Sequence, residues 1–355
     1  MQEVSRTMHR AVIALVLSLM IAACGGAPAP AADRGAPAVA APERAPQPNI
    51  PVPAISGPMQ IKLGTGSSGG VYAPYGQGIV DLLNNKLPGA QLSVFPTSGS
   101  VDNLKYLKSG EIQIGIATVD SAWDASKGTG VFRETGPVEV RTIAVLYPSY
   151  IHVIASVDSG ITKVADLKGK RVSLGAAGSS TEVSAERIME AAGLDPSTDI
   201  NRSNLGVSEA VDQFSAGNLD AFFWNGGLPT AAVDRLIAAG SPKLIFLPTA
   251  EFIPAMVEKY GPLYTSLTPG ADVYGGVANG IPGIGLGNIL VVNANMPDDQ
   301  VYAILATIFN NLDMMQAAHP EARKLSLNTA ASGSSVEFHP GAIKFYQDQG
   351  VWGQR

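Results

Sequence analysis

Residues 62–76 read KLGTGSSGGVYAPYG and join a predicted strand to a predicted helix. Gly64, Gly66 and Gly69 form the pattern G-x-G-x-x-G, which is typical of dinucleotide-binding turns. An overlapping pattern, G-x-S-x-G, is centred on Ser68 and is typical of the nucleophile turn of α/β hydrolases. Both patterns need a strand before them and a helix after them. The stretch therefore predicts an α/β fold whichever pattern applies.

The rest of the chain alternates short β-type runs with longer amphipathic runs, which predicts βαβ units and parallel sheets. A run at 140–156 indicates two extended segments joined at Pro148, which we interpret as a hinge. Strands are predicted at 59–64, 91–96, 112–118, 171–177, 219–224 and 288–294, and helices at 71–87, 100–110, 180–193, 208–217 and 297–319.

The N-terminus predicts export. Residues 1–23 place Arg6 and Arg10 before an apolar run that is short for a membrane span, as in a secretory signal peptide. The ending Ile-Ala-Ala-Cys resembles a bacterial lipobox, so Cys24 is the expected lipidation site. Cys24 is also the only cysteine, which excludes an intramolecular disulfide. Residues 24–58 are rich in Ala and Pro and are expected to form an extended tether.

The remaining chain is long enough for two lobes. We predict a first lobe from residues 59–147 and 268–355, and a second lobe from residues 148–267. The chain would cross between the lobes twice, at Tyr147-Pro148 and within residues 264–274. Two lobes with two hinge crossovers form a clamshell, and hinge bending would open and close it.

Composition excludes several classes of protein. The formal net charge is −6 and no basic stripe is present, so nucleic acid is not an expected partner. No cluster of Glu, Asp and His has the spacing of a metal site, so no metal is expected. The dinucleotide interpretation also fails, because Pro96 and Thr97 stand where an acid should bind the ribose. We therefore expect no cofactor.

The hydrolase interpretation would use Ser68 as nucleophile, with Asp120 and His339 following in chain order. Only the Ala/Pro tether precedes the first strand, so no earlier loop is available to supply an oxyanion donor. His319 and His339 each precede a proline, which is typical of a helix boundary. A secreted serine hydrolase using Ser68 stays the alternative, and no enzymatic reaction is the main expectation.

A third interpretation needs only backbone chemistry. A Gly/Ser-rich turn at a helix start exposes unpaired N–H groups at the positive end of the helix, which can hold a carboxylate. The feature recurs as TSGSVDN at residues 97–103 and as AAGSSTE at residues 176–182. Each of these turns alone could be an ordinary helix cap. Three of them, distributed over both lobes, favour a ligand clamped between the lobes.

Several segments resemble a known family in family order: GTGSSGGVYAPYG, TSGSVDNLKYLKSGEIQIGIATVDSAWDAS, LKGKRVSLGAAGSSTE, SAGNLDAFFWNGGLP and HPGAIKFY. They are similar to the solute-binding proteins of TRAP transporters, TAXI type, over about residues 59–346. The resemblance implies a type II periplasmic-binding-protein fold in the periplasm or cell envelope. It also implies delivery of a small organic anion, such as glutamate, glutamine or 2-oxoglutarate, to TRAP membrane permease subunits.

Matched residue by residue, the resemblance implies the ligand contacts listed here: Ser67, Ser68, Gly69, Gly70, Val71, Tyr72, Ser98, Ser100, Asn103, Asp120, Trp123, Gly178, Ser179, Ser180, Thr181, Trp224 and Gly226. Asp120 could accept from a ligand amine or cap the following helix. Val71 departs from the tyrosine pair common in the family. The solute, the membrane that holds the anchor and the oligomeric state stay open, and so does a sensing role for a signalling partner.

Overall fold

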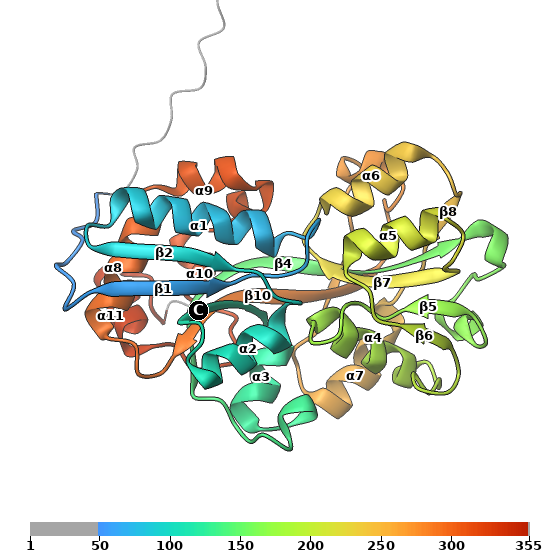
Figure 1. The fold of residues 1–355 in the computed structure, drawn as a ribbon, viewed down its shortest axis with the longest axis horizontal. Helices are drawn as coiled ribbons and strands as arrows, with labels where there is room; N and C mark the ends of the chain where they lie inside the picture. The colour runs from blue at the N-terminus through green and yellow to red at the C-terminus, as the bar shows by residue number, and fades with distance from the viewer. Residues whose placement is uncertain (1–48, 354–355) are drawn as a thin grey trace, which may run out of the picture. The chain divides into compact units, whose positions relative to one another are not determined.

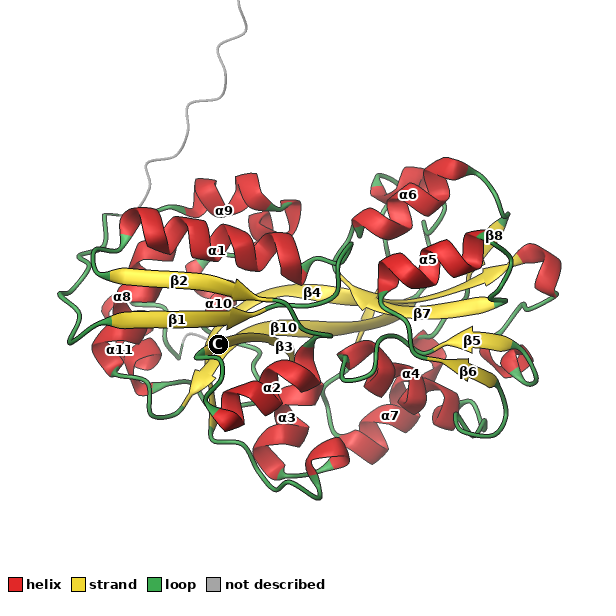
Figure 2. Ribbon diagram, viewed as in Figure 1, coloured by secondary structure: helices red, strands yellow, loops and turns green. Residues whose placement is uncertain are grey.

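The computed structural model describes residues 49–353, which are built on one mixed β-sheet with helices on both of its faces (Figures 1 and 2). The main strand order is β2-β1-β3-β10-β4-β7-β5-β6, with β8 beside β4 and β9 beside β10. The strands are β1 (Met59–Gly64), β2 (Ala90–Phe95), β3 (Ile114–Thr118), β4 (Val140–Ser156), β5 (Arg171–Ser173), β6 (Asn201–Ser203), β7 (Ala221–Gly226), β8 (Leu244–Phe246), β9 (Thr265–Leu267) and β10 (Gly283–Asn293).

The helices are α1 (Tyr72–Lys86), α2 (Ser100–Ser109), α3 (Val119–Lys127), α4 (Ser180–Ala191), α5 (Val207–Ser215), α6 (Ala231–Ala239), α7 (Ile253–Tyr260), α8 (Asp298–Phe309), α9 (Leu312–Ala318), α10 (Leu327–Ala330) and α11 (Pro340–Asp348). The alternation of strand and helix read from the sequence is confirmed. β1 pairs in parallel with β2 and β3, and β5 pairs in parallel with β6 and β7. We call the β1–β3 end the first half and the β5–β7 end the second half.

Two long antiparallel strands, β4 and β10, connect the halves. In the first half β4 pairs with β10, and in the second half it pairs with β7. The sequence predicts two segments joined at Pro148, but β4 is one continuous strand through that residue. Pro148 lies opposite Gly287, and a register shift follows between Asn288 and Ile289. Such irregular pairing tolerates a residue that has no N–H to donate.

The C-terminal segment returns to the first half, as predicted, where α8 and α9 contact α1. The single helix predicted at 297–319 is instead two helices. Asn311 adopts φ −137 and ψ 41, which is not helical. The side chain of the preceding Asn310 accepts a hydrogen bond from the Ile50 N–H at 2.7 Å and donates to the Ile50 carbonyl at 2.8 Å. The helix therefore ends at the point where the Asn310 side chain binds the segment at Ile50.

Residues 274–281 pack with the second half of the protein. Tyr274, Ala278 and Ile281 pack in one hydrophobic cluster with Tyr150 and Trp224 of the second half. The predicted boundary after residue 267 would assign them to the first lobe. The chain then returns to the first half through β10. The second hinge within residues 264–274 stays a prediction, and this packing does not favour it.

Three hydrophobic clusters stabilise the sheet. One lies under α1, α8 and α11 in the first half, and a second lies under α5 and α6 in the second half. The third is continuous across both halves, because it joins side chains of α2 and α3 to side chains of α4 and α7. The two halves thus share a core on one face of the sheet and have separate cores on the other face (Figure 1).

The predicted signal peptide, Cys24 and residues 24–48 of the predicted tether lie outside the described residues. Residues 49–58 form no helix or strand, but they are held against the body: Ile50 is buried, and the Ser56 carbonyl accepts from Gln300 at 3.1 Å. The tether prediction was wrong for this segment, because Ile50 inserts into the first-half core.

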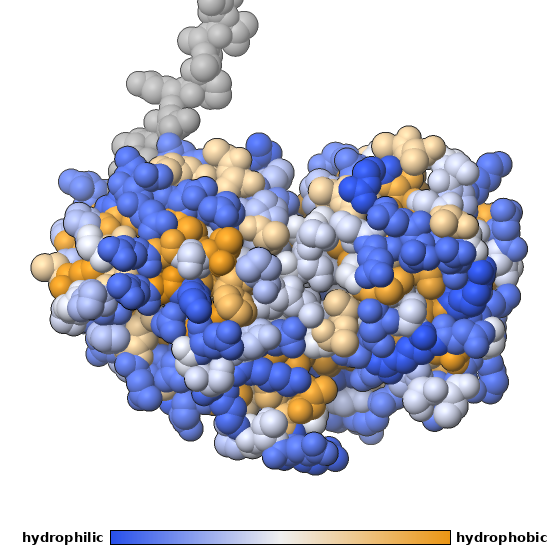
Figure 3. All heavy atoms as spheres, in the orientation of Figure 1, coloured by the Kyte–Doolittle hydropathy of each residue, from blue (hydrophilic) through white to orange (hydrophobic). Residues whose placement is uncertain are grey.

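Within residues 49–353, every helix is too short or too polar to cross a bilayer. The same part of the chain brings no three His, Cys, Asp or Glu side chains together as a metal site. Polar and apolar side chains alternate over the face shown in Figure 3, with a notch between the halves at the upper edge of that view.

Candidate functional site

A small cavity lies where the ends of β1 and β7 and the loop after β2 meet the first turns of α1 and α4. About 20 Å³ of it is open to the centres of water molecules, which is room for about one or two waters. Both halves contribute to its lining, which consists of Gly66, Ser67, Gly70, Val71, Tyr72, Ser98, Gly99, Tyr147, Ser179, Ser180, Thr181, Trp224, Asn225 and Gly226.

The first wall is the loop between β1 and α1. Gly69 has φ +78, a left-handed conformation that glycine adopts without a steric penalty. The Gly70 N–H donates to the Ser67 carbonyl at 3.3 Å. The N–H groups of Val71 and Tyr72 follow at the start of α1, where helix N–H groups have no intrahelical partner. They are available to a ligand in the cavity.

The second wall is the start of α4 in the second half. The Ser179 hydroxyl accepts from the Glu182 N–H at 3.2 Å, so Ser179 is an ordinary N-cap as well as a cavity residue. The Thr181 hydroxyl accepts from the Asn225 N–H at 3.1 Å, which ties α4 to the end of β7. Ser180 is buried and also lines the cavity.

Aromatic side chains close the cavity. The Trp224 indole N–H donates to the Thr230 hydroxyl at 2.8 Å, and the ring lies so close to Gly70 that a Cβ there would be 2.8 Å from Cη2. The Tyr72 hydroxyl donates to Asn288 Oδ1 at 2.6 Å. Burial raises the pKa of Tyr72 and of Tyr147 well above the ordinary value, so both hydroxyls stay protonated.

Tyr147 differs from the other lining residues because its hydroxyl is buried and makes no hydrogen bond to the described residues. Its ring lies 5.3 Å from the ring of Tyr75, whose hydroxyl is also buried and unpaired. Tyr147 also borders a wider cavity of about 670 Å³ behind the crossing strands, with Val119, Pro148 and Gly287. Tyr147 therefore belongs to the lining of both cavities.

Backbone contacts between the halves surround the small cavity. The Asp102 N–H donates to the Gly178 carbonyl at 3.0 Å, and the Ser208 hydroxyl donates to the Ser68 carbonyl at 3.0 Å. The Leu228 N–H donates to Glu321 Oε1 at 2.6 Å. Burial raises the pKa of Glu321, whereas Lys324 opposes that rise. The halves are thus closed on each other around this site.

The structure brings ten of the predicted ligand contacts together in the cavity lining: Ser67, Gly70, Val71, Tyr72, Ser98, Ser179, Ser180, Thr181, Trp224 and Gly226. Seven others do not line it: Ser68, Gly69, Ser100, Asn103, Asp120, Trp123 and Gly178. The ligand contacts themselves stay a prediction.

Physical reasons are visible for several of these absences. Ser68 is exposed. Asn103 is fully buried and donates to the Thr65 and Ile116 carbonyls, both at 2.8 Å, which fastens strand ends together. Trp123 is partly exposed on α3, with the Lys127 ammonium 4.7 Å from its ring centroid.

Asp120 belongs to a different contact between the halves, which we call the ion-pair interface: Asp120 and Asp124 of α3, Arg187 of α4, and Tyr264. Asp120 Oδ2 lies 3.5 Å from Arg187 Nη1, and Asp124 Oδ2 pairs with Arg187 Nη2. Arg187 Nη1 also donates to the Tyr264 hydroxyl at 2.6 Å. The carboxylate of Asp120 therefore serves an ion pair away from the cavity.

The electrostatics of the ion-pair interface follow from burial. Burial raises the pKa of the Asp120 carboxyl, whereas Arg187 and hydrogen bonds from Thr118 and Ser121 oppose the rise. Burial alone would lower the pKa of Arg187, but the charges around it raise the pKa above its ordinary value. Asp120 also accepts from the Ser121 N–H at 2.7 Å, but it lies inside the first turn of α3, and the N-cap position belongs to Thr118.

Sequence reasoning missed four lining residues: Gly66, Gly99, Tyr147 and Asn225. The glycines lie inside the Gly/Ser-rich turns, so the same signal could have included them. Asn225 lies between two predicted residues on β7. Tyr147 was assigned only to the hinge, and nothing local distinguishes a hinge tyrosine from one that lines a cavity.

The predicted hydrolase components Ser68, Asp120 and His339 are bonded to other described residues and not to one another. His152 is buried between the Trp224 carbonyl and the Tyr274 hydroxyl, and burial lowers its pKa to about 4. His339 Nδ1 accepts from the Gly341 N–H at 3.2 Å, as a helix cap, which confirms its predicted structural role. His319 caps the following turn in the same way. All the hydrogen bonds of these side chains go to residues other than Ser68.

Comparison with known proteins agrees with this architecture. The sequence pattern of the NMT1-like family matches residues 63–350, which is most of the chain. The chain belongs to the NMT1-like family. This NMT1-like protein is also similar to a binding protein component of an ABC phosphonate transporter from Pseudomonas aeruginosa, with TM-score 0.51 and 13% identity over 75% of this chain and 79% of that one.

A weaker likeness links the NMT1-like protein to the periplasmic aliphatic sulphonate binding protein of Escherichia coli, with TM-score 0.46 and 18% identity over 82% of this chain and 84% of that one. A third match is the alkanesulfonate-binding protein of Xanthomonas axonopodis pv. citri, with TM-score 0.46 and 19% identity over 83% and 92%. The fold assignment rests on the phosphonate-transporter component, with its TM-score of 0.51. The predicted fold class is confirmed: this is the two-lobed α/β fold of periplasmic binding proteins.

Proposed function

We propose that this protein is an extracytoplasmic solute-binding protein that captures a small organic anion and presents it to membrane permease subunits. One observation carries the proposal: the N-termini of α1 and α4, from opposite halves, converge on one small cavity. Neither half forms the site alone. Binding a ligand to both walls would favour the closed arrangement over an open one.

The chemistry of the lining suits an anion. Unpaired N–H groups at two helix starts are positive partial charges that need no counter-ion, and hydroxyl groups beside them can donate to carboxylate oxygens. Ser180 and Thr181 stand on the second-half wall, and Val71 and Tyr72 stand on the first-half wall. Trp224 supplies an apolar side.

The transport partner and the membrane anchor rest on the sequence. The TAXI-like motifs suggest TRAP permease subunits as the partner, and the lipobox-like ending suggests a lipid anchor at Cys24 in the periplasm or cell envelope. The solved protein that shares the fold at TM-score 0.51 is a component of an ABC transporter, so the fold itself is compatible with either transporter class. The test is co-purification of the protein with membrane permease subunits. Capture of TRAP subunits, with no capture of ABC permease subunits from cells that lack the TRAP subunits, would support the TRAP partner.

A serine hydrolase is not favoured by the surroundings of Ser68. Its backbone carbonyl accepts from Ser208, and its side chain is exposed. A test separates the two functions: Ser68→Ala would abolish turnover of an ester substrate by a hydrolase, but it would leave most of the ligand affinity of a binding protein.

The main experiment is a thermal-shift screen of the mature protein against small carboxylates, sulfonates, amino acids, sugars and peptides. We expect small acids to raise Tm and the neutral compounds to leave it unchanged. Ser180→Ala should weaken the response, because it removes a hydroxyl from the cavity lining. Ser109→Ala, an exposed serine at the end of α2, is the control. Stabilisation by a sugar or peptide, with no response to any acid, would contradict the anion proposal.

A further inference from the structure

We propose that the bound anion is a short 2-oxo or 2-hydroxy monocarboxylate, with its carboxylate between the starts of α1 and α4 and its C2 oxygen at the Tyr147 hydroxyl. The inference rests on the proposed binding function and narrows its ligand. Three features of the cavity carry it: the charge of the lining, the size of the space and the unpaired hydroxyl of Tyr147.

The charge of the site matches one negative group. Every side chain that lines the cavity is uncharged, because the lining consists of Gly, Ser, Thr, Asn, Val, Tyr and Trp and the lining tyrosines stay protonated. Each helix N-terminus is equivalent to roughly +0.5 of an elementary charge. Two such ends amount to roughly one positive charge, which suits a single carboxylate.

The same arrangement disfavours two other kinds of acid. A second carboxylate would be buried without a counter-charge, which is costly in a closed cavity. The ammonium group of an amino acid would face two positive helix ends and find no carboxylate among the lining residues. Dicarboxylates and amino acids should therefore bind less well than a monocarboxylate of similar length.

The space points to a short chain. The cavity is open to the centres of water molecules over only about 20 Å³, and contacts such as Asp102 N–H to Gly178 carbonyl close its rim. That space holds about one or two waters, so even a three-carbon acid needs the rim contacts to loosen. The shortest acids need the smallest opening, and a five-carbon diacid would need a larger one.

Tyr147 supplies the reason for a C2 oxygen. Its side chain is only 2% exposed and lines the cavity, yet its hydroxyl has no partner within the described residues. Buried polar groups are almost always hydrogen-bonded, so an unpaired donor in a binding cavity indicates an acceptor on the ligand. Tyr72 already donates to Asn288 at 2.6 Å, so it does not need this oxygen.

The test compares ligands that differ by one group, by calorimetric titration of the mature protein. Lactate carries a C2 hydroxyl that propionate lacks. Alanine carries an ammonium group at C2 where lactate has the hydroxyl. 2-Oxoglutarate carries a second carboxylate arm that pyruvate lacks. We expect lactate and pyruvate to bind, and propionate to bind roughly tenfold more weakly, as the loss of one hydrogen bond implies. Alanine and 2-oxoglutarate should bind more weakly still.

Two matched variants locate the effect. Tyr147→Phe removes only the hydroxyl and should abolish the preference for lactate over propionate while propionate binding persists. Tyr75→Phe removes a buried, unpaired hydroxyl on the neighbouring ring that does not line the cavity, so the preference should remain.

Other outcomes overturn the inference in separable ways. Tighter binding of 2-oxoglutarate or glutamate than of pyruvate would refute the monocarboxylate class and leave the anion-binding function standing. A lactate preference that survives in Tyr147→Phe would refute the role of Tyr147. Failure of every acid, in a protein shown to be folded by its melting transition, would refute the proposed function itself.

Discussion

The two halves of the protein meet in two chemically different places. At the cavity, which we call the cavity interface, they meet around a small space through backbone groups, hydroxyls and uncharged side chains, with one carboxylate, Glu321, among the surrounding contacts. At the ion-pair interface they meet through Arg187 between Asp120 and Asp124, all of them buried. The first interface leaves donors unused, whereas the second pairs its charges.

This difference indicates which of the two interfaces opens more easily. Hydrogen bonds of the cavity interface can be exchanged for water at small net cost. Separating Arg187 from its carboxylates in a buried setting is much more costly. The ion-pair interface also lies on the face where the hydrophobic core is continuous between the halves. We expect the cavity interface to open and close with ligand while the ion-pair interface stays closed.

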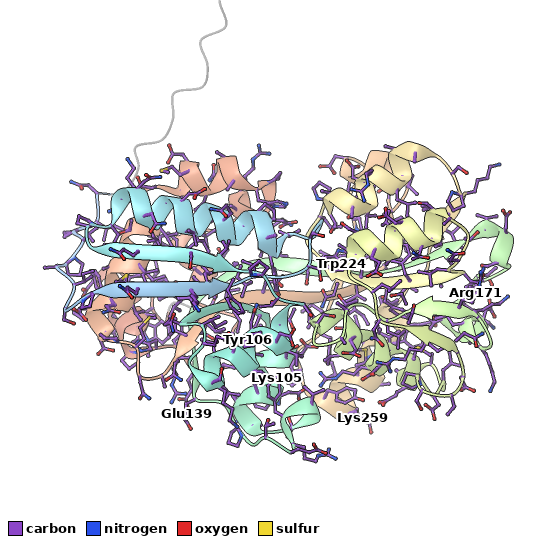
Figure 4. The ribbon with its side chains drawn as sticks, in the orientation of Figure 1. Lys105, Tyr106, Glu139, Arg171, Trp224 and Lys259 are labelled. Atoms are coloured by element: carbon purple, nitrogen blue, oxygen red, sulfur yellow. The ribbon has the colours of Figure 1, made fainter. Side chains whose placement is uncertain are left out.

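The largest effect should come from breaking the ion-pair interface. Arg187→Met leaves two buried carboxylates without their partner and should lower the free energy of unfolding by about 3–5 kcal/mol. Urea denaturation of the two proteins measures the difference. Arg171→Met is the matched control, because Arg171 pairs with Asp220 at the exposed far end of the second half (Figure 4). Equal effects of the two changes would contradict the contrast between the interfaces.

The next prediction concerns the pH dependence of stability that His152, beside the cavity interface, should cause. His152 supports the cavity wall through the Trp224 carbonyl, and burial lowers its pKa from 6.5 to about 4. The unfolded chain therefore binds a proton at this residue between about pH 6.5 and 4, and the folded chain does not. Stability should fall as the pH decreases through this window, by about 3 kcal/mol in total.

Denaturation curves of wild type and His152→Gln across that pH range measure this contribution. The variant should lose this part of the pH dependence and keep the parts due to other groups, including His319 and His339, whose pKa values burial also lowers. Parallel pH profiles for the two proteins would show that His152 does not supply it.

A smaller effect should follow from filling the cavity interface. An added Cβ at Gly70 would lie 2.8 Å from the Trp224 ring, which its hydrogen bond to Thr230 holds in place. Gly70→Ala should cost about 1–3 kcal/mol of stability and also weaken ligand binding. In Gly287→Ala the new Cβ would meet only Val119, at 3.1 Å, and binding should persist. Unchanged affinity in Gly70→Ala would place the ligand elsewhere.

The smallest effect distinguishes capping from binding. Ser179 and Ser326 each cap a helix by accepting an N–H at 3.2 Å, but only Ser179 lines the cavity. Replacing either with Ala should cost about 1 kcal/mol of stability, read from thermal melts. Only Ser179→Ala should also reduce the ligand-induced rise in Tm. Loss of that rise in Ser326→Ala would indicate an indirect effect of helix stability.

Much of this architecture could be predicted from the sequence. The predicted strand at 59–64 and the helix at 100–110 match the structure within one residue, because hydrophobic period and glycine punctuation act locally. The Gly/Ser turns before α1 and α4 were found for the same reason. The break at Asn310 and Asn311 was missed, because its cause is a distant segment at Ile50 that binds the Asn310 side chain.

The candidate site also combines features that the local sequence predicts with features that depend on tertiary packing. The Gly/Ser turns predict helix starts with open N–H groups at strand ends, because each start is encoded in a few adjacent residues. The positions of the side chains follow from tertiary packing: Ser67 lines the cavity while Ser68 is exposed, and Asp120 pairs with Arg187. These outcomes depend on which side chains from far along the chain arrive beside them, and no local pattern encodes that arrival.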